Sequence, residues 1–195
     1  LQTLKKKEIY SGAGEMIKMH AIDSPESFDK IASSYEEIIA NFDIMERFIY
    51  NSLVMKKRLI EIDEFDTGPR NVMNYGHSFG HAIEVATNYE IPHGIAVTIG
   101  MDIANFIAAE FGISNRENFE RMHDVLHNNC STYRYVDIDQ KLMMNALSKD
   151  KKNSAKQLRL ILPDIDGCIQ IGLYNNNTEL SKAIVKYFKL YVGTV

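Results

Sequence analysis

The order of apolar and polar residues predicts a chain built mainly from amphipathic helices. Residues 3–22 show helical spacing, which we expect the small residues at 11–14 to interrupt. Ser24 and Pro25 suit the N-cap and the first position of a second helix. Residues 42–62 repeat apolar side chains at helical intervals. We expect the apolar stripes of these helices to lie in the core.

The second half of the chain continues this pattern and adds one hairpin. Pro92 suits the first turn of a helix whose apolar run, residues 95–103, should be buried on most sides. The other elements are expected at 116–128 (helix), after Asp137 (short helix), at 157–162 and 168–171 (strands paired across a turn) and at 178–191 (amphipathic helix). The fold class is therefore mainly α, with a small β-hairpin.

Composition and charge exclude several kinds of partner. The 195 residues are 45% hydrophobic, enough for one substantial core or at most two small ones. A net charge of −4 gives no general attraction to nucleic acid. No stretch is apolar enough to cross a membrane or to act as a secretory signal, so we expect a cytoplasmic protein. Cys130 and Cys168 form neither a metal-type spacing nor a disulfide framework, which fits a reducing compartment.

Candidate chemistry concentrates between residues 70 and 101, which hold three of the six histidines. His77 and His81 are four residues apart and share one face of a helix, and His93 stands at the start of the next. Ser78 occupies the position where a zincin H-E-x-x-H motif needs its general-base Glu, which argues against a metalloprotease. The residues alone leave two interpretations open: packed or surface histidines, and a metal or catalytic site.

Two further observations bear on these interpretations. Gly76, Gly80 and Gly94 frame the imidazoles, and because glycine weakens a helix by about 1 kcal/mol relative to Ala, we expect close approach by a backbone or a ligand. His123 and His127 repeat the four-residue spacing, but on a polar stretch, so we expect them to be surface residues, with metal binding as the lesser alternative.

The segment NYGHSFGHAIE, followed by HGIAVTIGM, resembles the GHTFGHAIE and HGEAVAxGM motifs of 3-dehydroquinate synthase and related sugar-phosphate cyclases. The resemblance continues through SGAGEMIK at 11–18, MKKRLIEIDEFDTGPR at 55–70 and DKKNSAKQLRLILPDIDG at 150–167. It implies that residues 1–195 form a single multi-helical C-terminal domain that binds metal and substrate. Because no G-x-G-x-x-G follows a strand, the NAD-binding Rossmann-like domain is expected to be absent from this chain.

The resemblance also implies roles for individual residues. Glu15, His77 and His93 match the metal ligands, with Zn²⁺ or Co²⁺ as the ion, whereas spacing alone pairs His77 with His81. The matching substrate-binding residues are Lys18, Lys56, Asp63, Arg70, Asn74, His81 and Lys151, of which His81, Lys56 and Arg70 are also the expected catalytic residues. Without the family match, Glu15 and Lys18 are an ordinary exposed ion pair.

The implied activity is that of a carbon-oxygen lyase of the shikimate pathway. A homodimer that uses NAD and a divalent metal would convert a heptulosonate phosphate, its sugar-phosphate partner, to a carbocycle with release of phosphate. The fragment alone is expected to be inactive. Because the ligand imidazoles must be neutral to bind metal, activity should fall below about pH 6, near the free imidazole pKa.

Three departures from the family pattern keep other functions open. Ile95 replaces the Glu after His-Gly, Gly14 replaces an Ala, and His20, which could line the cavity, replaces a Gly. They suggest a related cyclase such as a 2-deoxy-scyllo-inosose synthase. A metal-dependent polyol dehydrogenase and a non-enzymatic helical module for dimerisation or binding are the further alternatives.

Overall fold

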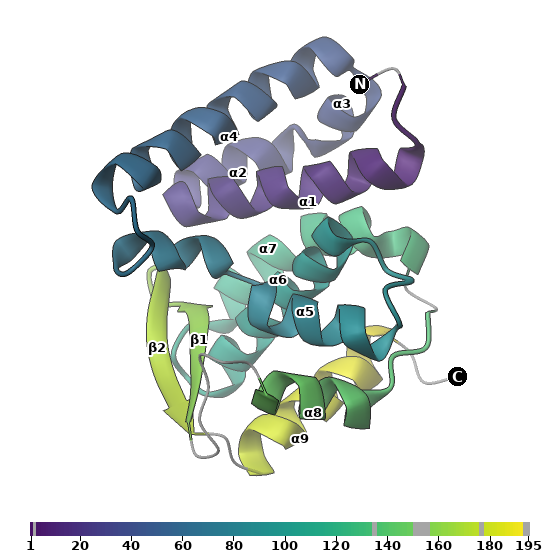
Figure 1. The fold of residues 1–195 in the computed structure, drawn as a ribbon, viewed down its shortest axis with the longest axis vertical. Helices are drawn as coiled ribbons and strands as arrows, with labels where there is room; N and C mark the ends of the chain where they lie inside the picture. The colour runs from purple at the N-terminus through teal and green to yellow at the C-terminus, as the bar shows by residue number, and fades with distance from the viewer. Residues whose placement is uncertain (2, 134–135, 150–156, 176–177, 193–195) are drawn as a thin grey trace.

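The computed structural model describes residues 1, 3–133, 136–149, 157–175 and 178–192 (Figure 1). These residues form helices and one two-stranded antiparallel hairpin, so the expected fold class is confirmed. The elements are α1 (Lys6–Asp23), α2 (Pro25–Ser33), α3 (Tyr35–Ala40), α4 (Phe42–Ile62), the 3₁₀ helix η1 (Pro69–Asn74), α5 (His77–Ala86), α6 (His93–Glu110), α7 (Arg116–Cys130), the 3₁₀ helix η2 (Ser131–Tyr133), α8 (Gln140–Lys149), β1 (Gln157–Pro163), β2 (Ile169–Asn175), α9 (Thr178–Tyr187) and the π-helical turn η3 (Phe188–Val192).

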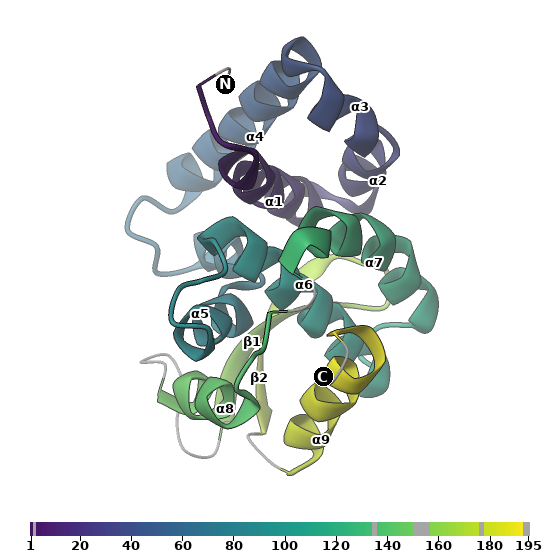
Figure 2. The same ribbon diagram turned by 90° about the vertical axis from the view of Figure 1, so that its right-hand side faces the viewer.

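Helix α6 is the central element of the core. It contacts α1, α5, α7, α9 and β1. Figures 1 and 2 show α1–α4 as one layer above it, with the hairpin, α8 and α9 on the other side. Every residue from Gly94 to Ala108 is buried, including the whole expected apolar run at 95–103. A helix that carries apolar residues on all its faces, as α6 does, suits such an interior position.

Helices α1 and α6 cross at two glycines. A Cβ atom on Gly14 would collide with the carbonyl oxygen of Gly94, and one on Gly94 would collide with the carbonyl oxygen of Ser11. The expected interruption at residues 11–14 is wrong, because α1 runs unbroken from Lys6 to Asp23. The small residues there permit close contact between two backbones and do not bend the helix. This crossing brings Glu15 close to the start of α6.

Helix α4 is less buried than its apolar stripe predicts. Its bounds, Phe42–Ile62, are as expected, but only Met45 and Ser52 are buried. Leu53 is 58% exposed and Ile62 is 69% exposed. The reason is that α4 is an outer helix, which contacts α1, α3 and η1 and leaves its remaining face uncovered by the described residues.

The hairpin packs one face of β1 into the core. Leu158, Leu160 and Leu162 are at most 1% exposed, and β1 contacts α6. Leu160 pairs with Gly172 in the middle of the register. The second strand runs to Asn175 and is longer than expected, because its pairing with β1 continues to Gln157.

The described residues contain neither a membrane-spanning helix nor a disulfide bond. None of their helices combines the length and apolar character needed to span a bilayer. Neither Cys130 nor Cys168 forms a disulfide bond within the described residues.

Candidate metal centre

Three imidazoles meet where two helices begin. His77 opens α5, His81 follows one turn later, and His93 opens α6. The ring centroids of His77 and His81 lie 5.3 Å apart, those of His77 and His93 5.2 Å, and those of His81 and His93 5.7 Å. One ring nitrogen from each residue lies within 4.8 Å of the others, a spacing that suits a shared cation.

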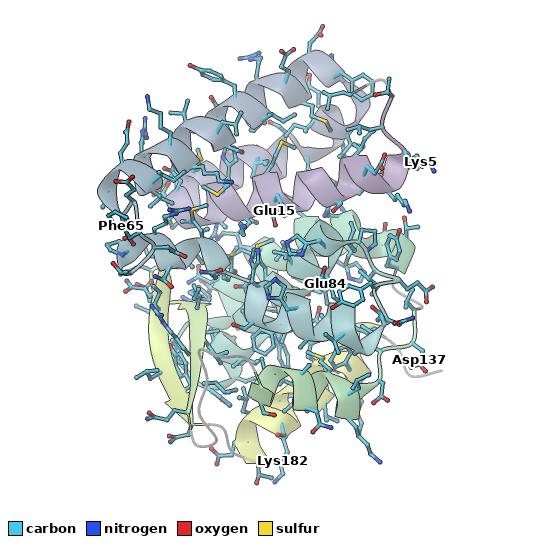
Figure 3. The ribbon with its side chains drawn as sticks, viewed as in Figure 1. Lys5, Glu15, Phe65, Glu84, Asp137 and Lys182 are labelled. Carbon is cyan, nitrogen blue, oxygen red and sulfur yellow. The ribbon has the colours of Figure 1, made fainter. Side chains whose placement is uncertain are left out.

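Glu15 reaches the same point from α1 (Figure 3). Its Oε1 lies 3.7 Å from Nε2 of His93 and 3.9 Å from Nε2 of His77. Oε1 is buried and has no hydrogen-bond partner among the described residues. Around a tetrahedral Zn²⁺ with ligands at about 2.1 Å, neighbouring ligand atoms lie about 3.4 Å apart. The two distances from Oε1 of Glu15 to the imidazole nitrogens therefore exceed those of a closed site by about half an ångström or less.

Two hydrogen bonds orient the imidazoles toward this point. Nδ1 of His77 lies 3.2 Å from the carbonyl oxygen of Tyr75, and Nδ1 of His93 lies 3.1 Å from Oε1 of Glu84. Because a carbonyl oxygen only accepts hydrogen bonds, Nδ1 of His77 carries the proton and Nε2 keeps its lone pair. The carboxylate of Glu84 likewise keeps the proton on Nδ1 of His93, so that Nε2 of His93 keeps its lone pair. Metal-binding histidines are commonly held in this way.

Sequence reasoning gave Glu84 no role, although helical periodicity could have found it. Glu84 lies seven residues after His77 and three after His81, so two turns of α5 place it on the same face. Its side chain lies in the same region as the three imidazoles and is only 12% exposed. A carboxylate at that spacing, beside an H-x3-H pair, is the expected form of an orienting partner.

Lys18 is a buried partner of Glu15. It is 4% exposed, and its Nζ donates to Oε2 of Glu15 at 2.7 Å. Burial raises the pKa of Glu15, but the charge and hydrogen bond of Lys18, together with the two neighbouring imidazoles, outweigh it, so this pKa ends below its ordinary value. Burial lowers the pKa of Lys18, although Glu15 opposes this shift. The pair is therefore not the exposed surface pair that spacing alone suggests.

A pocket of about 120 Å³ opens beside the imidazoles. Asn74, His77 and His81 line it, as does Arg159 from β1, to which sequence reasoning assigned no role. The structure thus brings the predicted substrate residues Asn74 and His81 together. Arg159 was missed because nothing in the sequence shows which face of the hairpin borders this pocket.

Arg70 and Asp63 lie outside the lining of this pocket. The guanidinium of Arg70 donates to the carbonyl oxygen of Glu64 at 2.9 Å. The carboxylate of Asp63 accepts backbone N–H groups from residues 67, 68 and 70. In this structure Asp63 therefore shapes the loop that leads to Arg70, and its contact with substrate stays a prediction.

The two remaining predicted substrate residues are lysines. Lys56 is exposed on α4 and lies near enough to Lys18 to help lower the pKa of that ammonium group, after the larger effect of burial. Lys151 lies outside the described residues. Their substrate roles stay predictions.

The expectation that His123 is a surface residue is wrong. Its side chain is 16% exposed, and its Nδ1 lies 2.8 Å from Oδ2 of Asp102. The hydroxyl of Tyr187 donates to the same oxygen at 2.7 Å. His127 is half-buried, with its ring centroid 5.1 Å from that of His123. The polar stretch of α7 thus includes a face that pairs with the buried Asp102 of α6.

His20 does not line the pocket described above. It is 3% exposed, and its Nδ1 lies 2.9 Å from Oγ of Ser27. Its ring also packs against Phe48, with the centroids 5.4 Å apart. His20 therefore belongs to the packing of α1 against α2 and α4.

Comparisons with known proteins agree with this fold and these motifs. Residues 12–153 match the family described as 3-dehydroquinate synthase C-terminal. A 3-dehydroquinate synthase of Helicobacter pylori (strain P12) is 33% identical over 188 residues, covering 96% of this chain and 53% of the relative. One from Dictyoglomus turgidum is 36% identical over 177 residues, covering 88% of this chain and 48% of the relative. The chain therefore spans about half the length of these curated relatives.

Two solved structures share the fold. A 2-deoxy-scyllo-inosose synthase complexed with carbaglucose-6-phosphate, NAD⁺ and Co²⁺ matches with a TM-score of 0.76 and 20% identity, over 95% of this chain and 54% of that one. A 2-epi-5-epi-valiolone synthase from Streptomyces hygroscopicus subsp. jinggangensis, with NAD⁺ and Zn²⁺ bound, matches with a TM-score of 0.77 and 18% identity, over 96% and 52%.

The fold is thus one that part of each of these two synthases adopts. Since the family match covers well over half of the residues, the chain belongs to the 3-dehydroquinate synthase family, in its C-terminal region. The resemblance inferred from the motifs is confirmed.

Proposed function

We propose that this chain forms the metal-binding part, and some of the substrate-binding part, of a sugar-phosphate cyclase of the 3-dehydroquinate synthase type. The enzyme would convert a heptulosonate phosphate to a carbocycle and release phosphate. The observation that carries the proposal is the buried Oε1 of Glu15, which has no hydrogen-bond partner among the described residues and lies 3.7 and 3.9 Å from two imidazole nitrogens. The names of the relatives support the same class of activity.

The donor set fits a divalent metal. Glu15, His77 and His93 would hold Zn²⁺ or Co²⁺, since one carboxylate and two neutral imidazoles leave open positions for substrate oxygens. When bound, the ion would act as a Lewis acid toward a substrate oxygen. His81 is exposed at the edge of the cluster, where it could contact substrate or transfer a proton at a ring nitrogen.

Cationic groups around the centre suit an anionic substrate. Lys18 places a buried ammonium group beside the carboxylate of Glu15, and Lys56 lies near it. The guanidinium of Arg70 is held by an exposed hydrogen bond to Glu64, which costs little to exchange for an anionic ligand. In the proposal, these groups hold the substrate in register with His81.

NAD does not fit the described part of this chain. Its two strands form an antiparallel hairpin, whereas a dinucleotide site is built on a parallel βαβ unit. The relatives are about twice as long, which leaves room in them for such a unit. We therefore propose that NAD is held mainly by residues outside the described part of this chain, and we derive no step from it. We also propose that the enzyme is a homodimer in the cytoplasm.

Three residues differ from the family motifs, and their positions in the fold favour a 3-dehydroquinate synthase over a cyclase with another substrate. Ile95 is fully buried in α6, Gly14 packs on Gly94, and His20 packs on Ser27. None of the three lines the pocket beside the imidazoles. Changes that serve helix packing give no reason to assign a different substrate.

Product analysis tests the proposal. A protein that contains this chain, supplied with NAD and Zn²⁺, should release phosphate from a heptulosonate phosphate without net formation of NADH. Net NADH without phosphate would indicate a polyol dehydrogenase, and phosphate release from glucose 6-phosphate alone would indicate a 2-deoxy-scyllo-inosose synthase. Metal binding with no turnover of either substrate would indicate a binding module. The 195-residue chain alone should be inactive.

A further inference from the structure

The hairpin brings a guanidinium group to the pocket beside the candidate metal centre. The residues that line this pocket are Asn71, Asn74, His77, Ser78, His81, Arg159 and Ile161. Building on the proposed function, we propose that Arg159 binds an oxyanion of the substrate, carboxylate or phosphoryl, and so positions the substrate against His81. Arg159 is thus a substrate-contacting residue additional to those that the family motifs indicated.

Strand geometry directs Arg159 away from the core. Side chains alternate between the two faces of a strand. Leu158 and Leu160 are fully buried on the face that meets the interior. Arg159 and Ile161 therefore share the other face, and both line the pocket. The side chain of Arg159 is half-buried there.

The hairpin holds this residue in a defined place. Arg159 pairs with Leu173 within seven paired positions of the two strands. The strand β1 contacts α6, the helix that begins at His93, and β2 contacts η1. A group on a paired strand that packs against the elements of the site is held more closely than one on a loop.

The pocket has the chemistry of an anion site. Among the described residues that line it, Arg159 carries the only permanent charge, and no carboxylate is present. The other polar groups are amides, a hydroxyl and imidazoles, which suit substrate hydroxyl groups. A guanidinium group can donate two parallel hydrogen bonds to either a carboxylate or a phosphoryl group.

The size of the pocket indicates how much of the substrate it holds. Its volume is about 120 Å³, whereas complete ligand sites have about 300–1,000 Å³. The pocket therefore accommodates one end of a ligand, while His77 and His81 connect it to the metal centre. Arg159 then determines which end of the substrate enters this pocket.

Calorimetric titration of the Zn²⁺-loaded chain tests the proposal. The probes are glucose 6-phosphate, which offers a phosphoryl group, gluconate, which offers a carboxylate, and neutral glucose. The variants are Arg159→Gln, which removes the charge, and Arg159→Lys, which keeps the charge but loses the paired donors. Arg47→Gln is the matched control, because Arg47 is exposed on α4.

We expect at least one anionic probe to bind more tightly than glucose, and Arg159→Gln to weaken it roughly 10- to 100-fold. The probe that loses affinity identifies the oxyanion. Arg159→Lys should retain part of the preference for the anionic probe over glucose, and Arg47→Gln should retain all of it. If Arg159 had a purely structural role, the affinity for the anion would not depend on the charge at residue 159. Should Arg159→Gln not fold, an undiminished preference in Arg159→Lys would count against paired hydrogen bonds and overturn the proposal.

Two results would overturn the proposal directly: equal binding of all three probes by the unmodified chain, and equal anion binding by Arg159→Gln. Neither bears on turnover, so the proposed function would stand. Conversely, Arg159-dependent anion binding, together with no cyclisation of any sugar phosphate by a longer protein that contains this chain and is supplied with NAD and Zn²⁺, would reject the proposed function. Arg159 would then be an oxyanion-binding residue for a different substrate.

Discussion

Oε1 of Glu84 lies 3.1 Å from Nδ1 of His93, and this contact directs the other ring nitrogen toward the carboxylate of Glu15. The pair joins the body of α5 to the first residue of α6. The orientation of one candidate ligand therefore depends on a residue of a neighbouring helix.

Replacing Glu84 by Gln should weaken metal binding without removing it. The substitution takes away the charge that holds Nδ1–H of His93, and loss of such a partner typically costs about 10- to 100-fold in metal affinity. Competition with a chelator measures the change in Zn²⁺ affinity. Glu90→Gln is the control, because Glu90 is an exposed acid close by in sequence. Equal affinities for both variants would show that the contact has no orienting role.

Single substitutions should identify the third ligand of the proposed centre. We expect Glu15→Ala, His77→Ala and His93→Ala each to lose stoichiometric metal, whereas His81→Ala should keep it. The geometry alone does not decide between His81 and Glu15, since one ring nitrogen from each of the three histidines lies within 4.8 Å of the others. Metal analysis after dialysis gives the answer. Retention by Glu15→Ala together with loss in His81→Ala would mean that three imidazoles bind the ion.

The metal-free chain should lose stability as the solution is acidified. Burial, reinforced by the charge of Lys18, lowers the pKa of His77 from 6.5 to about 4. Between these two values the unfolded chain binds a proton on His77 and the folded chain does not, so the free energy of unfolding falls as the pH falls. The loss over this interval should be on the order of 3 kcal/mol.

Urea unfolding of the metal-free protein at pH 7 and pH 4.5 measures this effect. His77→Gln should lose less stability than the unmodified chain, because acidic groups still titrate but residue 77 does not. Identical losses in both proteins would contradict the assignment. The same lowered pKa keeps the imidazole of His77 neutral at a lower pH than the free imidazole value suggests.

Two glycines of α1 should respond in opposite ways to substitution by Ala. Gly14→Ala forces a Cβ against the backbone of Gly94 and should cost about 1–3 kcal/mol. Gly12→Ala meets nothing within 4 Å and should stabilise the helix by about 0.5–1 kcal/mol. Thermal unfolding of both variants measures the difference. Destabilisation of the same size at both positions would show that the close α1–α6 crossing does not require a glycine at position 14.

Local pattern predicted the elements of this protein well. Helix α4 occupies the residues that its apolar spacing indicates, and α2 begins with Ser24 as N-cap and Pro25 in the first turn. Caps and apolar periodicity act within a few residues, so they can be read from one segment at a time. The burial of α4 could not be read in this way, because it depends on which neighbours cover each face.

The helical fold, the shared helix face of His77 and His81, the approach of His93 and, through the motifs, the family could all be inferred from the residues alone. The folded chain was needed to show that Gly14 permits a helix crossing, that Glu84 orients His93, and that Arg159 faces the pocket. These outcomes depend on contacts between segments far apart in the chain, and no local spacing or propensity encodes which distant backbone will meet which side chain.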